Sequence, residues 1–163
     1  MSDKLIQKLK TISLFSELQH NTKALSEILS IAKIVSFNKN QVIFYEGDHG
    51  NCLYIPISGS FEILKKTLEG DTYTVSKLTS DTPVFFGELA LIDDDRRSAT
   101  VVALDEGESL VLEKARFDEF SKKHPELALP IVREISKTLA ARLRKTTDDM
   151  LKIFQALVEE IRD

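Results

Sequence analysis

The segment FGELALIDDDRRSATVV, residues 86–102, places a glycine-led helical run ahead of an arginine and a β-branched strand. The first turn of a helix has unpaired N–H groups and a partial positive charge, and Gly87 leaves those amides open to a ligand. Arg97 adds a planar donor that matches two phosphate oxygens, and an unpaired arginine beside a buried strand is costly. Glu88 is an acceptor suited to a sugar hydroxyl. The segment therefore predicts a site for an anion that carries a ribose.

A simpler interpretation pairs Arg97 with the aspartate run 93–95 as a surface ion pair. Such a pair is worth about 0–1 kcal/mol and leaves the helical run unexplained. The consecutive aspartates lack the alternating ligands and central glycine of a calcium loop, and His20, His49 and His124 have no metal-ligand spacing. We expect no metal and no cofactor. Because no nucleophile-elbow, zinc or Walker pattern is present, we also expect no catalysis.

The composition is that of one folded domain. Of 163 residues, 42% are hydrophobic and 29% are charged, a balance that argues against disorder. No apolar run approaches the ~18–20 residues that span a bilayer, and the N-terminus lacks the core of a signal peptide. The only cysteine, Cys52, excludes an internal disulfide and suits a reducing cytoplasm. A net charge of −4 gives no reason to expect a nucleic-acid partner. We expect a cytoplasmic domain that binds neither DNA nor membranes.

Periodicity divides the chain into three regions. Residues 1–35 have the apolar spacing of helices, and residues 36–113 consist of short β-rich runs that contain all six glycines. Residues 114–163 are helical again, with a short helix before Pro125 and a long one after it. The predicted fold is α+β, an antiparallel β-roll flanked by N-terminal helices and a long C-terminal helix, in a single domain over residues 1–163.

The long helix carries an apolar stripe that runs from Ile131 to Ile161 at spacings of three and four. A helix of this length extends beyond the roll on which it packs. It could fold over its own β-core, or it could pair with the same helix of a second chain in a short coiled coil. We favour the homodimer, because a β-domain of this size rarely covers such a helix alone.

The segment also resembles a known motif. Residues 87–91 (GELAL), the nine-residue step from Glu88 to Arg97 and the following SATV resemble the phosphate-binding cassette of cyclic-nucleotide-binding domains. This family includes the regulatory subunit of cyclic-AMP-dependent protein kinase and the bacterial catabolite activator protein. Further matching segments occur in the family's order: LFSEL (14–18), IFYEGD (43–48) and LYIPISGSFEI (53–63). The resemblance implies that the cassette occupies residues 86–101 of a β-roll.

The resemblance also implies roles for individual residues. Backbone amides of the helical run would bind the cyclic phosphate, from Gly87, Leu89 and Ala90. Glu88 would accept from the ribose 2′-hydroxyl, and Arg97 would pair with the exocyclic phosphate oxygens. Ser98 and the amides around Ala99 are further donors, and a serine after the arginine tends to accompany cyclic AMP, whereas threonine accompanies cyclic GMP.

A second resemblance lies in the long helix. LAARLRKTT, residues 139–147, is similar to a family helix in which two adjacent hydroxyl residues reach the adenine. Thr146 and Thr147 occupy those positions, one facing the ligand of its own subunit and the other the ligand across a dimer. The residues alone allow another interpretation, in which Thr146 is a tolerated polar position within a coiled coil.

These observations predict non-enzymatic binding of a cyclic nucleotide, with cyclic AMP expected and a cyclic-GMP-selective sensor as an alternative. Ligand would order the cassette and shift the C-terminal helix, which relays the signal. Residues 148–163 carry five acidic and two basic side chains and no helix-turn-helix follows them, so we expect no DNA binding. The rival interpretation is a ligand-free interaction scaffold that dimerises through its long helix. No effector partner is indicated.

Overall fold

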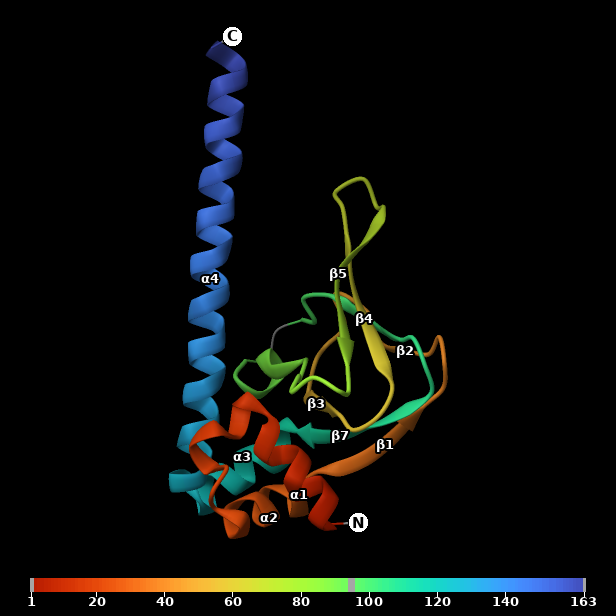
Figure 1. Cartoon of the computed structure of the whole chain (residues 1–163), viewed down its shortest axis with the longest axis vertical. Helices are drawn as coiled ribbons and strands as arrows, with labels where there is room; N and C mark the ends of the chain where they lie inside the picture. The colour runs from red at the N-terminus through yellow and green to blue at the C-terminus, as the bar shows by residue number, and fades with distance from the viewer. Residues whose placement is uncertain (1, 94–95, 163) are drawn as a thin grey trace.

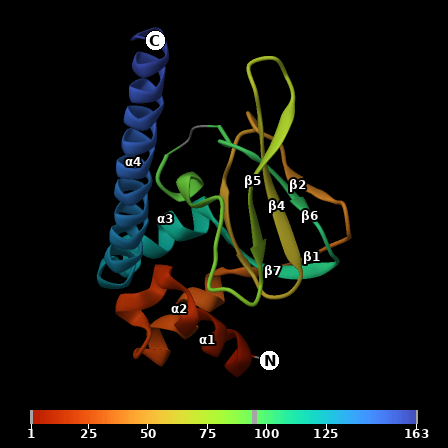
Figure 2. The ribbon, with the colours of Figure 1, turned by 45° about the horizontal axis from the view of Figure 1, so that its top comes forward.

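The computed structural model describes residues 2–93 and 96–162. A helical layer of α1 (Ser2–Thr11), the 3₁₀ segment η1 (Ser13–Leu18) and α2 (Thr22–Ile31) lies beneath a roll of β-strands (Figure 1). The last helix, α4 (Pro125–Arg162), rises along one side of this roll, with α3 (Lys114–Lys123) at its base (Figure 2). The two termini lie at opposite ends of the molecule.

Two antiparallel sheets form the roll. The first has the order β1 (Lys33–Phe37), β7 (Gly107–Glu113), β3 (Cys52–Pro56). The second has the order β2 (Val42–Phe44), β6 (Thr100–Ala103), β4 (Ser60–Lys66), β5 (Thr72–Thr79). The predicted α+β class with an antiparallel roll is confirmed.

The first strand follows closely on the N-terminal helices. The expected boundary lies near residue 35, and in the structure α2 ends at Ile31 and β1 starts at Lys33. The β-branched residues Ile34 and Val35 favour an extended backbone, and in β1 they pair with Leu110 and Ser109 of β7. Strand pairing therefore decides this boundary.

Most of the buried hydrophobic side chains that the structure describes fall into two clusters. The larger one joins the N-terminal helices, the first sheet and the start of α4, with Phe15, Leu53 and Ile131 among its members. The smaller one packs on the inner face of the second sheet and consists of Phe37 at the end of β1, Phe86, and Phe61, Val101 and Ala103 of β4 and β6. Because Phe86 is the first residue of the cassette, the smaller cluster anchors the cassette to the roll.

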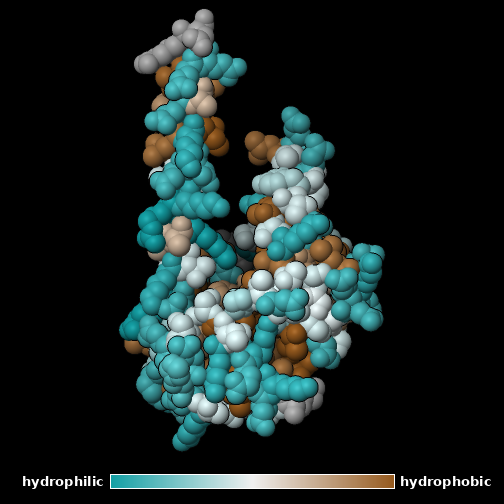
Figure 3. All heavy atoms as spheres, in the orientation of Figure 1, coloured by the Kyte–Doolittle hydropathy of each residue, from teal (hydrophilic) through white to brown (hydrophobic). Residues whose placement is uncertain are grey.

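The C-terminal part contains α3 (Lys114–Lys123) and α4 (Pro125–Arg162). Early in α4, Ala128, Ile131 and Ile135 are buried against the rest of the domain. Beyond Arg142 the helix projects past the roll, and most of its large apolar side chains are exposed (Figure 3). Among the described residues, no helix combines the length and the apolar character that a membrane span requires.

Candidate functional site

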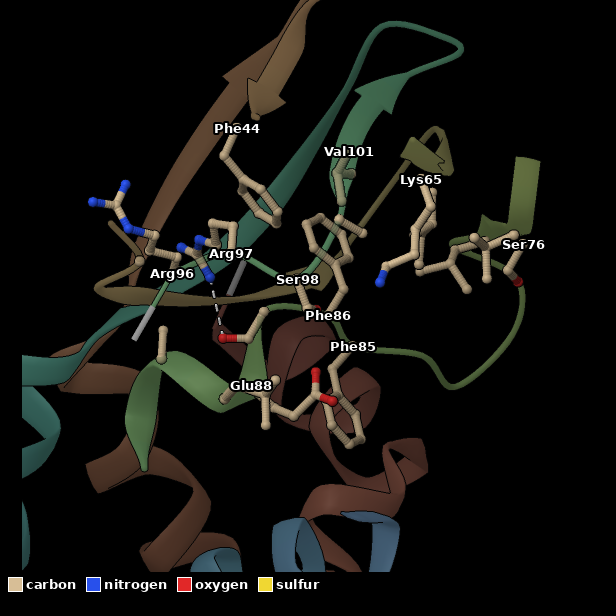
Figure 4. Close-up of a pocket in the computed structure, with 18 of the residues that line it drawn as sticks. Phe44, Lys65, Ser76, Phe85, Phe86, Glu88, Arg96, Arg97, Ser98 and Val101 are labelled. Atoms are coloured by element: carbon tan, nitrogen blue, oxygen red, sulfur yellow. Dashed lines mark hydrogen bonds between the residues drawn. The ribbon is translucent and has the colours of Figure 1, made fainter. Parts of the chain in front are cut away.

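A cavity of about 420 Å³ opens between the cassette, the strands β4 and β5, and α4 (Figure 4). Such a volume lies within the range of small-ligand sites. The cassette residues predicted from the sequence all line this cavity: Gly87, Glu88, Leu89, Ala90, Arg97, Ser98 and Ala99. Arg142 reaches it from α4. The structure thus brings together residues that come from distant parts of the chain.

Gly87 is required here for two reasons. It caps the 3₁₀ turn η2 (Glu88–Leu91) with a φ of +75°, in the left-handed region that favours glycine. A Cβ at this position would lie 2.7 Å from Nη1 of Arg97 and 2.9 Å from the carbonyl oxygen of Cys52. The GELAL run is therefore one tight turn rather than an α-helix. Within it the Ala90 amide donates to the Gly87 carbonyl, at a distance of 3.2 Å.

The cassette is fixed at its start by aromatic packing. Phe86 stacks on Tyr54, with ring centroids 5.1 Å apart and an interplanar angle of 6°. The two residues also exchange backbone hydrogen bonds of 2.9 and 3.0 Å. Because the main chain and the side chain of Phe86 are both held, the turn that follows has a defined position relative to the roll.

Arg97 is a buried cation, with 8% of its surface exposed. Its Cζ lies 4.1 Å from the centroid of the Phe44 ring, and its Nη1 donates to the Gly87 carbonyl at 3.3 Å. Its Nε has no hydrogen-bond partner among the residues that the structure describes. Burial lowers the pKa of the Arg97 guanidinium, although the neighbouring Tyr54 and Cys52 act in the opposite direction. A buried donor without a partner is costly, and an anion in the cavity would supply one.

The turn that contains Gly47 and Gly50 holds the backbone of Arg97. The amide of Arg97 donates to the Asp48 carbonyl at 2.7 Å, and the Gly47 amide donates to the Arg97 carbonyl at 2.9 Å. A Cβ on Gly50 would lie 2.7 Å from Nε of Arg97. The sequence alone does not indicate Gly50 or Phe44 as supports for Arg97, because neither is near it in the chain. The surface ion pair considered for Arg97 does not fit its burial, and Asp94 and Asp95 lie outside the described residues.

Glu88 is also buried, at 3% exposed, and it forms an ion pair with Arg142 of α4. This contact joins the cassette directly to the long helix. Arg142 is not among the site residues that the sequence predicts. The available signal was its position in the 139–147 segment, one helical turn before Thr146.

The two threonines predicted as base contacts lie outside the lining of the cavity. Both are exposed, and Thr147 Oγ1 donates to the Leu143 carbonyl of its own helix at 2.9 Å. Within a single chain, therefore, the cavity is lined by the predicted cassette residues and by Arg142, but not by the two threonines. A contact of Thr146 or Thr147 with a ligand stays a prediction.

The model of the family described as "Cyclic nucleotide-binding domain" matches residues 34–124. The chain belongs to the cyclic nucleotide-binding domain family. This family is a regulatory binding domain and typically non-enzymatic. Residues 34–124 include the whole cassette and most of the roll, so the family match and the cavity coincide.

Two curated relatives illustrate the range of proteins that contain such a domain. The chain is 33% identical over 129 residues to the cAMP-dependent protein kinase regulatory subunit of Dictyostelium discoideum, covering 72% of this chain and 38% of that protein. It is 27% identical over 115 residues to lysophospholipase nte1 of Neurospora crassa, covering 71% of this chain and 7% of that protein. The chain thus spans a minor part of these relatives, and in the lysophospholipase the match is confined to the cyclic nucleotide-binding domain.

Among solved structures, the Thermus thermophilus catabolite activator protein superposes with a TM-score of 0.75 at 28% identity. The match covers 85% of this chain and 61% of that chain. The resemblance found in the cassette therefore extends to the fold of the whole domain.

Proposed function

We propose that this chain is a non-enzymatic receptor domain for a cyclic nucleotide, with cyclic AMP as its ligand. The observation that carries the proposal is the buried Arg97 guanidinium, whose Nε lacks a partner in a cavity capped by the η2 turn. A cyclic phosphate would supply two anionic oxygens to the guanidinium. The amides of η2, Ser98 and Ala99 would complete the phosphate site.

Glu88 suits the ribose. Its carboxylate is buried and one oxygen is already paired with Arg142, which leaves the second oxygen to accept from the 2′-hydroxyl. Cyclic AMP is preferred because the Dictyostelium relative is named for it and because Ser98 follows the arginine. Thr146 and Thr147 would reach the base only if α4 or a second chain brought them closer.

The Glu88–Arg142 pair suggests how binding is relayed. A ligand that binds the second oxygen of Glu88 acts on the carboxylate that holds Arg142, and therefore on the preferred position of α4. Coupling of this kind requires the ligand to bind one arrangement of α4 more tightly than the other. Hydrogen exchange of residues 143–162 that is indifferent to bound nucleotide would contradict the relay.

The exposed apolar face of α4 supports a homodimer. Leu143 and Ile153 are 70% and 71% exposed, and both lie on the stripe that the sequence predicts for a coiled coil. This face also favours the second candidate function, a scaffold that dimerises without a ligand. The two functions differ only in whether the cavity is used.

Calorimetric titration with cyclic AMP and cyclic GMP separates them. We expect the protein, freed of carried-over nucleotide, to bind with micromolar or lower Kd and Arg97→Ala to abolish the heat. Binding that survives Arg97→Ala would remove Arg97 from the site. An absence of heat with both nucleotides would favour the scaffold.

A further inference from the structure

The end of the cavity formed by β4 and β5 is apolar except for two residues. Ile63, Val75 and Leu78 line it, together with Lys65 and Ser76. Figure 4 shows Lys65 entering from β4 with its ammonium directed into the cavity. If the phosphate lies at Arg97 and the ribose at Glu88, this end is the space left for the base, and its apolar wall suits a flat heterocycle.

Lys65 shares one face of β4 with residues that line the core and the cavity. Phe61 is fully buried in the smaller core cluster and Ile63 packs against that cluster. Lys65 is the next alternate residue of β4, and it still lines the cavity. Lys65 therefore adds a positive charge to a wall of the cavity that is otherwise largely apolar.

The ammonium group of Lys65 has only a weak ion pair with a neighbouring side chain among the contacts that the structure describes. Its Nζ lies 3.8 Å from Oε1 of Glu46, and the two side chains are 43% and 29% exposed. Half-exposed pairs at such a distance contribute little to stability, so Lys65 is able to turn toward a ligand. The flexible four-carbon stem of lysine makes this reorientation easy.

We propose that Lys65 reads the base of the bound nucleotide and raises the affinity for 6-oxopurines relative to adenine. The proposal rests on the function proposed above and deepens it. An ammonium has three donors and no acceptor. Guanine and hypoxanthine present the acceptors O6 and N7 on one edge, whereas adenine presents the donor N6 beside N7. A lysine at the base therefore favours the oxo group over the amino group.

This assignment separates two contributions to base preference. Ser98 lies at the phosphate end of the cavity, and Lys65 lies at the β4–β5 end. Removing Lys65 shifts selectivity toward cyclic AMP, and keeping it makes the domain responsive to cyclic GMP as well.

The test measures the Kd of cyclic AMP, cyclic GMP and cyclic IMP for the unmodified protein and for Lys65→Met. Cyclic IMP has the 6-oxo group without the 2-amino group of guanine and so isolates the proposed contact. We expect Lys65→Met to weaken cyclic GMP and cyclic IMP about tenfold and cyclic AMP less than about twofold. Lys65→Arg, which keeps a donor-only cation, should retain most of the preference.

Lys66→Met is the matched control, because it removes the same charge from the exposed next residue of β4, which does not line the cavity. It should change no affinity, and thermal unfolding of each variant checks the fold. Equal weakening of all three nucleotides by Lys65→Met would make Lys65 a general electrostatic contact and overturn the proposal, as would no change in any of them. If the unmodified protein binds no nucleotide, the proposed function itself fails, an outcome distinct from the other two.

Discussion

The cassette and the distal half of α4 differ in how far each is complete within one chain. In the cassette, Arg97 is 8% exposed and is enclosed by Phe44, Gly50 and Gly87. In the distal helix, residues 143–161 expose large apolar side chains, with Ile161 at 76%. A preformed pocket of this kind needs only its ligand, whereas an exposed apolar helix face gains its stability from packing against something else. Substitutions in the cassette should therefore affect ligand binding, and substitutions in the distal helix should affect assembly.

The largest effect is expected at Arg97. Arg97→Met keeps an unbranched side chain of similar reach but removes the charge, and we expect at least about 100-fold weaker cyclic AMP binding, since two charge-assisted hydrogen bonds are lost. The free energy of unfolding of the nucleotide-free protein should not fall, because a buried donor without a partner is removed. Calorimetry and thermal unfolding measure the two quantities. A destabilised variant with unchanged affinity would show Arg97 to be structural.

The next effect concerns the turn, where two glycines provide a matched pair. Gly87→Ala forces a Cβ into the left-handed region and against Arg97, and we expect about 30-fold weaker binding. Gly70 has a φ of +96° but nothing within 4 Å of its added Cβ. Gly70→Ala should therefore cost about 1 kcal/mol of stability and leave affinity unchanged. If both variants bind cyclic AMP with equal affinity, the close approach to Arg97 does not matter for binding. Glycine would then be needed at position 87 only to avoid backbone strain.

A smaller effect tests the link between the two regions. Glu88→Gln and Arg142→Gln should each weaken cyclic AMP about five- to tenfold, because the ion pair positions the carboxylate that accepts from the ribose. The double variant should be no weaker than the worse single variant, as expected for groups that act together. If the losses of binding free energy in the two single variants add up in the double variant, Arg142 and Glu88 contribute to binding independently. Hydrogen exchange of α4 should respond to nucleotide in the unmodified protein and not in Arg142→Gln.

The smallest effect on affinity is expected in the distal helix. Phe154→Glu places a charge on the apolar face, and we expect it to shift a homodimer toward monomer while cyclic AMP affinity changes less than about threefold. Gln155→Glu adds the same charge at the adjacent position and is the control. Sedimentation velocity over a range of concentrations measures the assembly. If the unmodified protein is a monomer at all concentrations, the apolar face of α4 does not bind a second copy of the chain.

The cassette and α4 differ, for a physical reason, in how far the sequence alone predicts them. The cassette is a local motif, in which conformational need (Gly87), charge (Arg97) and acceptor chemistry (Glu88) follow one another within a dozen residues, so short-range reasoning located it. Arg142 and Lys65 were missed because their importance depends on which strand or helix faces the cavity. Periodicity indicated an apolar stripe on α4 correctly, but it does not distinguish the buried Ile135 from the exposed Ile153.

By itself, then, the sequence determined the family, the α+β roll and the residues that make an anion site, because turn chemistry and periodicity are local properties of the chain. Only the tertiary structure decided that Arg97 is buried with an unpartnered Nε, that Arg142 holds Glu88 from α4, and that Lys65 points into the far end of the cavity. Each of these depends on contacts between residues that are far apart in the chain, such as Glu88 and Arg142, or on the direction of a strand. Contacts of this kind arise when the sheets and α4 pack together, and no local pattern encodes them.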